Sequence, residues 1–289
     1  MRTPLRLITA TALCAGTLSA TAPVTAAVDT AEPSRYVALG DSYAAAPLVP
    51  PADPAAPACL RSLADYPHIA ARALGAALSD VSCSAATVDH LSTSQHPGTA
   101  PQYDALTPDT DVVSVTIGAN DNGLFAEALN CVNILPPPHG ASCAEENTAG
   151  GTDRLGDRID AWAPVFATVL DEIARRAPSA EVFVVGYGNY IRPGGCHPAQ
   201  PFWKQDADHL QGTVNHLNAV LRQAAEEHGA VFVDTYTPGI GHDICAAPAD
   251  RYIEGPVPTR AAMPLHPNAT GARAAGESLA AAARATSTR

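Results

Sequence analysis

The chain has 289 residues and a formal net charge of -12, and its only lysine is Lys204. A surface with this excess of acid repels phosphate backbones and anionic lipid, so the composition argues against nucleic-acid binding and against attachment to an anionic membrane. Hydrophobic residues make up 46% of the chain, which at this length is enough for one large α/β domain with a buried core.

The first 26 residues have the pattern of a secretory signal peptide. Arg2 and Arg6 precede an apolar stretch over residues 7–18, and small residues follow as far as Ala26. The apolar stretch is too short to span a bilayer, so we expect cleavage after Ala26 and a single exported domain over residues 27–289. The leader carries two arginines and no acid, which leaves that domain with a net charge of -14.

Short apolar runs alternate with segments of helical period along the exported chain, which predicts a parallel sheet with helices on both faces. The runs lack polar alternation, as is typical of strands that are buried on both sides. The five expected strands are Arg35–Gly40, Asp80–Ser82, Val112–Ile117, Val182–Gly186 and Val231–Thr235.

Two long segments have apolar residues three and four positions apart, and each predicts one amphipathic helix, over residues 153–176 and about 207–228;. Pro164 predicts a kink in the first helix, and Gly229 ends the second. Shorter helices are expected at Tyr66–Leu78 and Ala269–Arg284. The Pro- and Gly-rich stretches between these elements are interpreted as surface loops of one domain.

An even number of cysteines in an exported chain predicts disulfides. Six cysteines remain once Cys14 has left with the leader, and the sequence alone does not select their pairing. Pairing neighbours along the chain closes the shortest loops: Cys59 with Cys83, Cys131 with Cys143, and Cys196 with Cys245. There is no Cys-x-x-Cys and no clustered His/Cys spacing, so we expect no metal site.

Polar residues follow two of the expected strands directly. The first strand ends in Gly40-Asp41-Ser42, and the third is followed by Gly118-Ala119-Asn120-Asp121. Ligands of open parallel sheets bind beyond the carboxyl ends of the strands, where the strand order reverses. If these two strands are neighbours, Ser42 and Asn120 face each other across that crevice. A serine there becomes a nucleophile once a base takes its proton, and the Asn120 amide and backbone N–H groups can hold the resulting oxyanion.

Two histidines follow the last expected strand, and either is a candidate for the base. His266 directly precedes Pro267, which favours a turn into the final helix and a fixed position for the imidazole. His242 lies near Cys245, in a loop that a disulfide would brace. Because geometry decides a base before its pKa does, we expect His266 to activate Ser42.

The segments GDSY at residues 40–43, GAND at 118–121 and LHPN at 265–268 resemble the first, third and fifth blocks of the SGNH (GDSL-type) hydrolases. The blocks occur in order over essentially the whole exported chain. The cysteines and the HPN ending look most like the secreted actinobacterial lipase and esterase branch. The resemblance implies a three-layer α/β/α fold with a five-stranded parallel sheet in flavodoxin-like order. It also implies a carboxylic ester hydrolase without a cofactor, with Ser42 as nucleophile, His266 as base and Asn120 as oxyanion donor.

The second block of the family usually reads C-S-G-A-T, whereas residues 83–87 of this chain read C-S-A-A-T. The resemblance therefore implies an oxyanion hole made of the Ser42 N–H, the Ala85 N–H and the Asn120 side chain. Alanine still has the backbone donor. Its Cβ costs free energy if the turn requires a positive φ.

The usual D-x-x-H of the fifth block would place an aspartate at position 263, where this chain has Met263. In the branch that the sequence resembles, a backbone carbonyl at that position orients the imidazole. We therefore expect a Ser–His dyad oriented by the Met263 carbonyl, with Asp243 as the alternative third member.

By resemblance, the expected substrates are acyl lipids or short-to-medium acyl esters, and the protein is expected to be a secreted monomer without stable membrane insertion. One alternative is an O-deacetylase for carbohydrate or cell-envelope esters that uses the same machinery. The other is a secreted binding module that has the fold but a degenerate site, as the departures at Ala85 and Met263 would allow.

Overall fold

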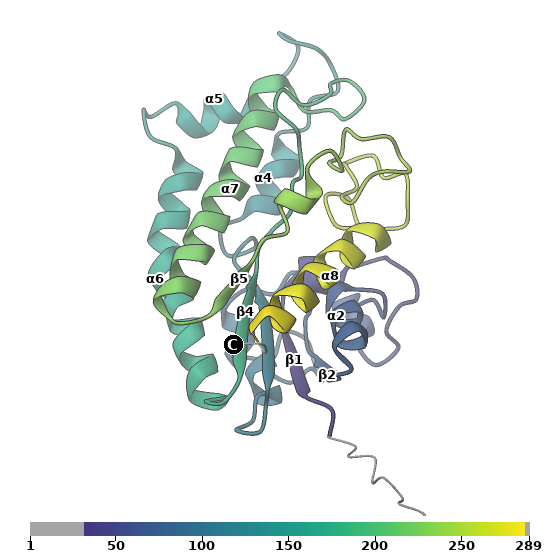
Figure 1. Ribbon diagram of the computed structural model, residues 1–289. Helices are drawn as coiled ribbons and strands as arrows, with labels where there is room; N and C mark the ends of the chain where they lie inside the picture. The colour runs from purple at the N-terminus through teal and green to yellow at the C-terminus, as the bar shows by residue number, and fades with distance from the viewer. Residues whose placement is uncertain (1–31, 287–289) are drawn as a thin grey trace, which may run out of the picture. The chain divides into compact units, whose positions relative to one another are not determined.

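A five-stranded parallel sheet lies at the centre of the domain (Figure 1). In this computed structural model, which describes residues 32–286, the strand order is β2-β1-β3-β4-β5. The strands are β1 (Arg35–Gly40), β2 (Ala77–Asp80), β3 (Val112–Thr116), β4 (Glu181–Val185) and β5 (Val231–Val233). This is the flavodoxin-like order, so the expected adjacency of the first and third strands is confirmed. The expected signal peptide, residues 1–26, lies outside the described residues.

Helices cover both faces of the sheet. Helices α7 (Lys204–Glu227) and α8 (Ala269–Thr286) both contact β4 and β5, and Figure 1 shows them on opposite sides of these strands. Beside them, α6 (Arg154–Arg176) packs against α7, and α2 (Tyr66–Leu74) packs against α8 and β2. The remaining helices are short: α1 (Ser42–Ala45), α3 (Asp89–Ser92), α4 (Leu124–Asn130), α5 (Cys143–Thr148) and the 3-10 turns Pro57–Cys59, Gln102–Ala105 and Thr237–Gly239.

The region around β2 differs from the sequence prediction. Helix α2 ends at Leu74 rather than at Leu78, because Gly75 adopts a left-handed conformation and caps it;. Strand β2 therefore begins at Ala77 and ends at Asp80, three residues earlier than expected at its start. As an edge strand paired only with β1, it shows partial exposure and not the continuous burial that the prediction relied on. Helix α6 runs through Pro164 without interruption.

Three disulfides join cysteines that are neighbours along the chain, which is the pairing that the shortest loops suggested. They are Cys59–Cys83, Cys131–Cys143 and Cys196–Cys245. The first ties the loop after α1 to the turn after β2, and the third ties the loop after β4 to the loop after β5. Each bridge thus fixes a connection at the carboxyl end of the sheet or beside it.

The contact between α2 and α8 depends on a glycine. A Cβ at Gly276 of α8 would lie 2.5 Å from the Cβ of Ile69 and 2.7 Å from the backbone oxygen of Tyr66. Gly276 is buried, whereas Gly212 in the middle of α7 is exposed and has open space where its Cβ would lie. The two helical glycines therefore offer a matched pair for testing how closely α8 packs.

We expect Gly276→Ala to lower the free energy of unfolding by about 1–3 kcal/mol, because the added methyl group forces the two helices apart. The control Gly212→Ala should raise it by roughly 0.5–1 kcal/mol, since alanine favours a helix over glycine where nothing is crowded. Urea denaturation followed by circular dichroism measures both values. Equal effects of the two substitutions would contradict the close packing of α8 on α2.

Candidate active site

Ser42 lies at the abrupt change from β1 to α1. Asp41 caps this helix by accepting the Tyr43 N–H at 2.8 Å, and Ser42 is the first helical residue. Gly40, the last residue of β1, precedes Asp41 and has φ +151°. A Cβ at Gly40 would lie 2.6 Å from the carbonyl oxygen of Thr116 in β3. Only glycine allows β1 to end so close to its neighbour, which brings Ser42 to the rim of the sheet.

His266 lies within hydrogen-bonding distance of Ser42, although 224 positions separate them in the chain. The imidazole Nε2 is 2.7 Å from the Ser42 Oγ. The loop that carries His266 is fixed on both sides of the residue. Glu254 accepts the Leu265 N–H and donates its own N–H to the His266 carbonyl, and Ile253 pairs with Pro267. The histidine that sequence reasoning favoured is therefore the one that the fold brings to the serine.

The carbonyl that faces the imidazole belongs to Pro264, at 2.8 Å from Nδ1. The expectation for Met263 is wrong. Its carbonyl accepts the backbone N–H of His266 at 3.2 Å and so closes the turn instead. Leu265, between Pro264 and His266, has φ +62°. This left-handed residue turns the chain so that the His266 ring reaches the Pro264 carbonyl.

The other candidates for the site have different partners. Asp243 binds the Arg192 guanidinium through both carboxylate oxygens at 3.1 Å and also accepts the Cys245 N–H at 2.8 Å. The ring nitrogen Nδ1 of His242 lies 2.6 Å from the backbone oxygen of Asp250, and the ring stacks on Tyr252 at 4.0 Å between centroids. Asp243 is thus not the third member of the triad, and His242 braces a loop.

Burial lowers the pKa of His266 to about 4, and the hydrogen bond with the Pro264 carbonyl opposes this shift only in part. The side chain is 6% exposed, so water solvates the imidazolium form poorly. A neutral imidazole is the form that can accept a proton from Ser42. The environment therefore keeps the candidate base ready well below neutral pH.

Asn120 lines the same pocket as Ser42 and His266. One N–H of its amide donates to the backbone oxygen of Ala86 at 2.9 Å, and a primary amide has a second N–H to offer. Ala85 is not among the described residues that line this pocket, but it immediately precedes the residue that holds Asn120. Its φ is +66°. The turn therefore requires the left-handed conformation, which costs an alanine about 1–2 kcal/mol.

A buried network that sequence reasoning missed joins the turns carrying Ser42 and Asn120. The Tyr187 hydroxyl donates to Asp41 at 2.6 Å and accepts the Ala119 N–H at 3.1 Å. Asp41 is fully buried, and this burial raises its pKa to about 7. The signal available in the sequence was a tyrosine two residues after the fourth strand, Val184-Val185-Gly186-Tyr187, at the same end of the sheet as the other blocks.

An apolar pocket of about 770 Å³, part of it open to solvent, begins at Ser42. Its walls come from segments that are distant in the chain, and Phe125 packs its ring against His266 at 5.5 Å between centroids. The apolar lining includes Leu124, Phe125, Ala128, Leu155, Tyr190, Ile191, Phe202, Leu210, Val214 and Leu265. A serine, a neutral imidazole and an amide donor thus meet at the mouth of a hollow that suits a hydrocarbon group.

Known proteins resemble this chain in sequence and in fold. Residues 38–274 match the GDSL-like Lipase/Acylhydrolase family. Lipase 2 of Streptomyces coelicolor is 40% identical, over 94% of this chain and 95% of the relative. The crystal structure of the extracellular lipase from Streptomyces rimosus superposes with a TM-score of 0.72 and 26% identity, over 86% of this chain and 99% of that chain. Phospholipase A1 from Streptomyces albidoflavus superposes with a TM-score of 0.71 and 25% identity, over 87% and 99%.

The buried state of His266 predicts its titration. We expect the imidazole to remain neutral down to about pH 4, as read from its NMR chemical shifts, because burial lowers the folded-state pKa;. Since an unfolded histidine titrates near 6.5, the unfolded chain binds more protons between these values, and this residue makes stability rise with pH there. A midpoint near 6.5 in the folded protein would contradict the burial argument.

Proposed function

The chain belongs to the GDSL-like lipase/acylhydrolase family and is a carboxylic ester hydrolase, and we propose that Ser42 and His266 perform the hydrolysis as a catalytic dyad. The observation that carries this proposal is the 2.7 Å contact between the Ser42 Oγ and the His266 Nε2 at the mouth of the apolar pocket. A general base at this distance can take the hydroxyl proton as the oxygen attacks.

In the first half of the reaction, the Ser42 Oγ attacks the ester carbonyl carbon and His266 Nε2 takes the proton. The negative charge that develops on the carbonyl oxygen is held by the Ser42 N–H, the Ala85 N–H and the free N–H of Asn120. His266 then gives its proton to the leaving alkoxide, and the carbon–oxygen bond breaks to leave an acyl-serine. In the second half, water attacks the acyl group, His266 takes its proton, and the acid leaves as Ser42 regains a proton.

The Pro264 carbonyl does the orienting that a carboxylate does in a triad. By accepting the Nδ1–H at 2.8 Å, it selects the tautomer in which Nε2 carries the lone pair toward Ser42. A carbonyl is a dipole rather than a full charge, so it stabilises the imidazolium less than a carboxylate would. The dyad thus depends more on the oxyanion donors than a triad does.

The shape and chemistry of the pocket support acyl lipids and medium-chain acyl esters as substrates. The pocket beyond Ser42 has an almost wholly apolar lining, and its volume is large enough to hold a hydrocarbon chain;. In the last turn of the pocket-lining helix α4 and just after it, Leu129, Ile134 and Leu135 expose large apolar side chains. Exposed apolar residues beside a binding pocket are typical of proteins that meet a lipid surface. The relatives that bear the names lipase and phospholipase A1 support the same substrate class.

We also propose that the protein is exported and acts as a monomer outside the cell. Its three disulfides suit an oxidising compartment;, and the similar Streptomyces rimosus lipase is extracellular. None of the helices within residues 32–286 has the length and apolar character needed to cross a membrane.

Three alanine variants test the assignment of the dyad. Ser42→Ala and His266→Ala should each lower kcat on p-nitrophenyl butyrate by about 10⁴-fold or more, since members of such a unit fail together. His242→Ala should retain near-normal kcat and lose thermal stability, because it removes the stacking on Tyr252. A fluorophosphonate should label the unchanged protein and not Ser42→Ala. Loss of turnover in His242→Ala, with activity kept in His266→Ala, would reverse the assignment of the base.

Blocking the pocket tests the acyl-chain proposal. Ala128 on α4 lines the pocket, whereas Ala126 on the same helix is exposed and lies outside the lining. We expect Ala128→Trp to lower kcat/KM for p-nitrophenyl decanoate at least tenfold while the acetate ester is still cleaved, because the indole fills the space for the chain. Ala126→Trp should leave the ratio of decanoate to acetate activity unchanged.

A chain-length series on the unchanged protein separates the proposal from its rival. Turnover should rise from p-nitrophenyl acetate to medium-chain esters, since burial of each CH₂ contributes roughly 0.8 kcal/mol. Acetylated xylan serves as the comparison substrate. Preference for acetate and for acetylated xylan would instead support a carbohydrate O-deacetylase.

A further inference from the structure

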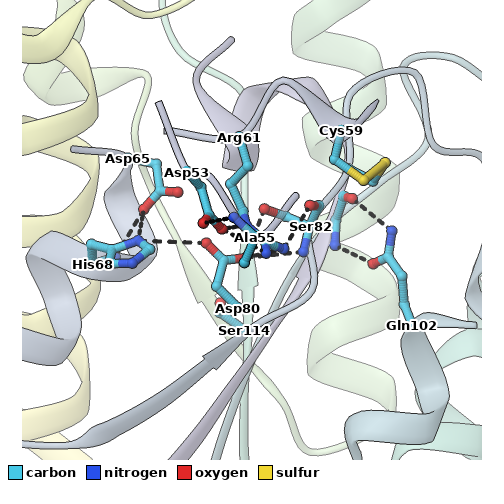
Figure 2. Close-up of polar contacts among 12 residues, drawn as sticks. Asp53, Ala55, Cys59, Arg61, Asp65, His68, Asp80, Ser82, Gln102 and Ser114 are labelled. Carbon is cyan, nitrogen blue, oxygen red and sulfur yellow. Dashed lines mark hydrogen bonds and ion pairs between the residues drawn. A yellow bond between two sulfur atoms is a disulfide. The ribbon is translucent and has the colours of Figure 1, made fainter. Parts of the chain in front are cut away.

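A second group of titratable side chains lies outside the pocket of Ser42, where α2 begins and β2 ends (Figure 2). Asp65 is the N-cap of α2, His68 is in its first turn, and Asp80 is the last residue of β2. Figure 2 shows the three side chains pointing toward one another, with dashed lines from the His68 ring to both carboxylates. One ligand atom from each lies within 4.8 Å of the others.

Each acid in this group has one oxygen bound to the backbone, and His68 Nδ1 lies 2.7 Å from that oxygen of Asp65. Asp65 Oδ1 accepts the His68 N–H at 2.9 Å, and Asp80 Oδ1 accepts the Ser82 N–H at 2.9 Å. The second oxygens, Asp65 Oδ2 and Asp80 Oδ2, are buried and have no hydrogen-bond donor among the described residues. The Asp65 side chain is 0% exposed and that of Asp80 is 3% exposed. Buried carboxylate oxygens without partners are costly in a native fold.

The nearest arginine binds a carboxylate outside the group. The Arg61 guanidinium lies 2.8 Å from Asp53, whereas its nearest approach to Asp80 is 3.9 Å. Asp53 and Asp80 therefore share the Arg61 guanidinium, and Arg72 is a second positive charge that acts on Asp65.

We propose that Asp65 Oδ2, His68 Nδ1 and Asp80 Oδ2 bind a divalent transition-metal ion, with Zn²⁺ as the best match. One imidazole nitrogen and two carboxylate oxygens are ligands that zinc accepts at about 2.0–2.2 Å. His68 Nδ1 lies 3.6 Å from Asp80 Oδ2, close to the separation of roughly 3.3 Å that two such ligands have around a tetrahedral ion. The His68 side chain is 23% exposed, so solvent reaches one side of the group.

Two other groups of potential ligands in the described residues do not compete with this site. Cys59 and Cys83 lie near His96, and Cys131 and Cys143 lie near Glu127. Their sulfur atoms are already joined in disulfides. A disulfide has no thiolate to offer a metal.

The ion would have a structural role. Asp80 also accepts the Ser82 hydroxyl at 2.7 Å, and Ser82 leads into Cys83 and the turn that contains Ala85. An ion at this site would therefore fix the start of α2, the end of β2 and the approach to that turn as one unit. We expect it to raise stability strongly and to change kcat little.

The test uses the full exported protein without an affinity tag, freed of metal by EDTA and dialysis. Titration calorimetry with ZnCl₂ should show one site per chain with a Kd of micromolar order or tighter. At about 100 times the Kd, Zn²⁺ should raise the Tm by about 5 °C or more. Butyrate ester turnover, measured at 25 °C where the apoprotein is folded, should change less than twofold.

A matched pair of histidine variants identifies the ligands. His68→Ala should abolish zinc binding and the rise in Tm. His216→Ala should leave both unchanged. His216 is a matched control because it too lies 2.7 Å from an aspartate, Asp160, but this pair is exposed and has no second carboxylate to complete a metal site. Asp80→Asn gives a second variant whose fold is checked by circular dichroism. Absence of zinc binding to the folded apoprotein, or binding that His68→Ala retains, would overturn the proposal and leave the two carboxyl groups sharing a proton.

Discussion

The site depends on how closely the end of β1 approaches β3. Gly40 leaves no room for a side chain beside the Thr116 carbonyl, and that same carbonyl accepts the Asp41 N–H at 2.9 Å. The Gln102 side chain binds both the N–H and the carbonyl of Gly40, at 2.8 and 3.0 Å. The strand thus ends at a point fixed on both sides, and Ser42 begins its helix there. Because the parallel register aligns Gly40 with Thr116, the segment that follows β3 brings Asn120 to the same rim.

A buried hydrogen-bond network then connects the parts of the site that are distant in the chain. Asp41 faces the fully buried Tyr187 hydroxyl, and this hydroxyl in turn receives the N–H that precedes Asn120. A carboxylate with no solvent around it needs such donors, since its charge is otherwise uncompensated. The acid of the first block therefore positions the serine turn and the asparagine turn relative to each other. It does not replace the missing acid of the triad, because both ring nitrogens of His266 already have partners in Ser42 and Pro264.

Elements with continuous burial could be predicted from the sequence. Features that depend on local backbone geometry could not. Strand β1 and the long helices α6 and α7 have strong apolar periodicity, and they lie within a few residues of the expected bounds. The edge strand β2 carries no such signal. Whether the Met263 or the Pro264 carbonyl faces the imidazole depends on the positive φ of Leu265. The sequence does not predict this conformation, since leucine rarely adopts it. The acyl pocket and the group around His68 each combine separate segments, and only the folded chain brings those together.

In the proposed dyad, the absence of a carboxylate behind His266 has a consequence for the base. A buried aspartate on Nδ1 would favour the imidazolium and raise the pKa, whereas the Pro264 carbonyl leaves burial in control and the pKa falls to about 4;. Such a base is weak in the resting enzyme. In the proposed reaction, however, a full negative charge develops beside the ring as the tetrahedral intermediate forms in the same poorly solvated space, and this charge favours the imidazolium. The oxyanion therefore supplies part of the stabilisation that an aspartate would otherwise provide, at the moment when the proton moves.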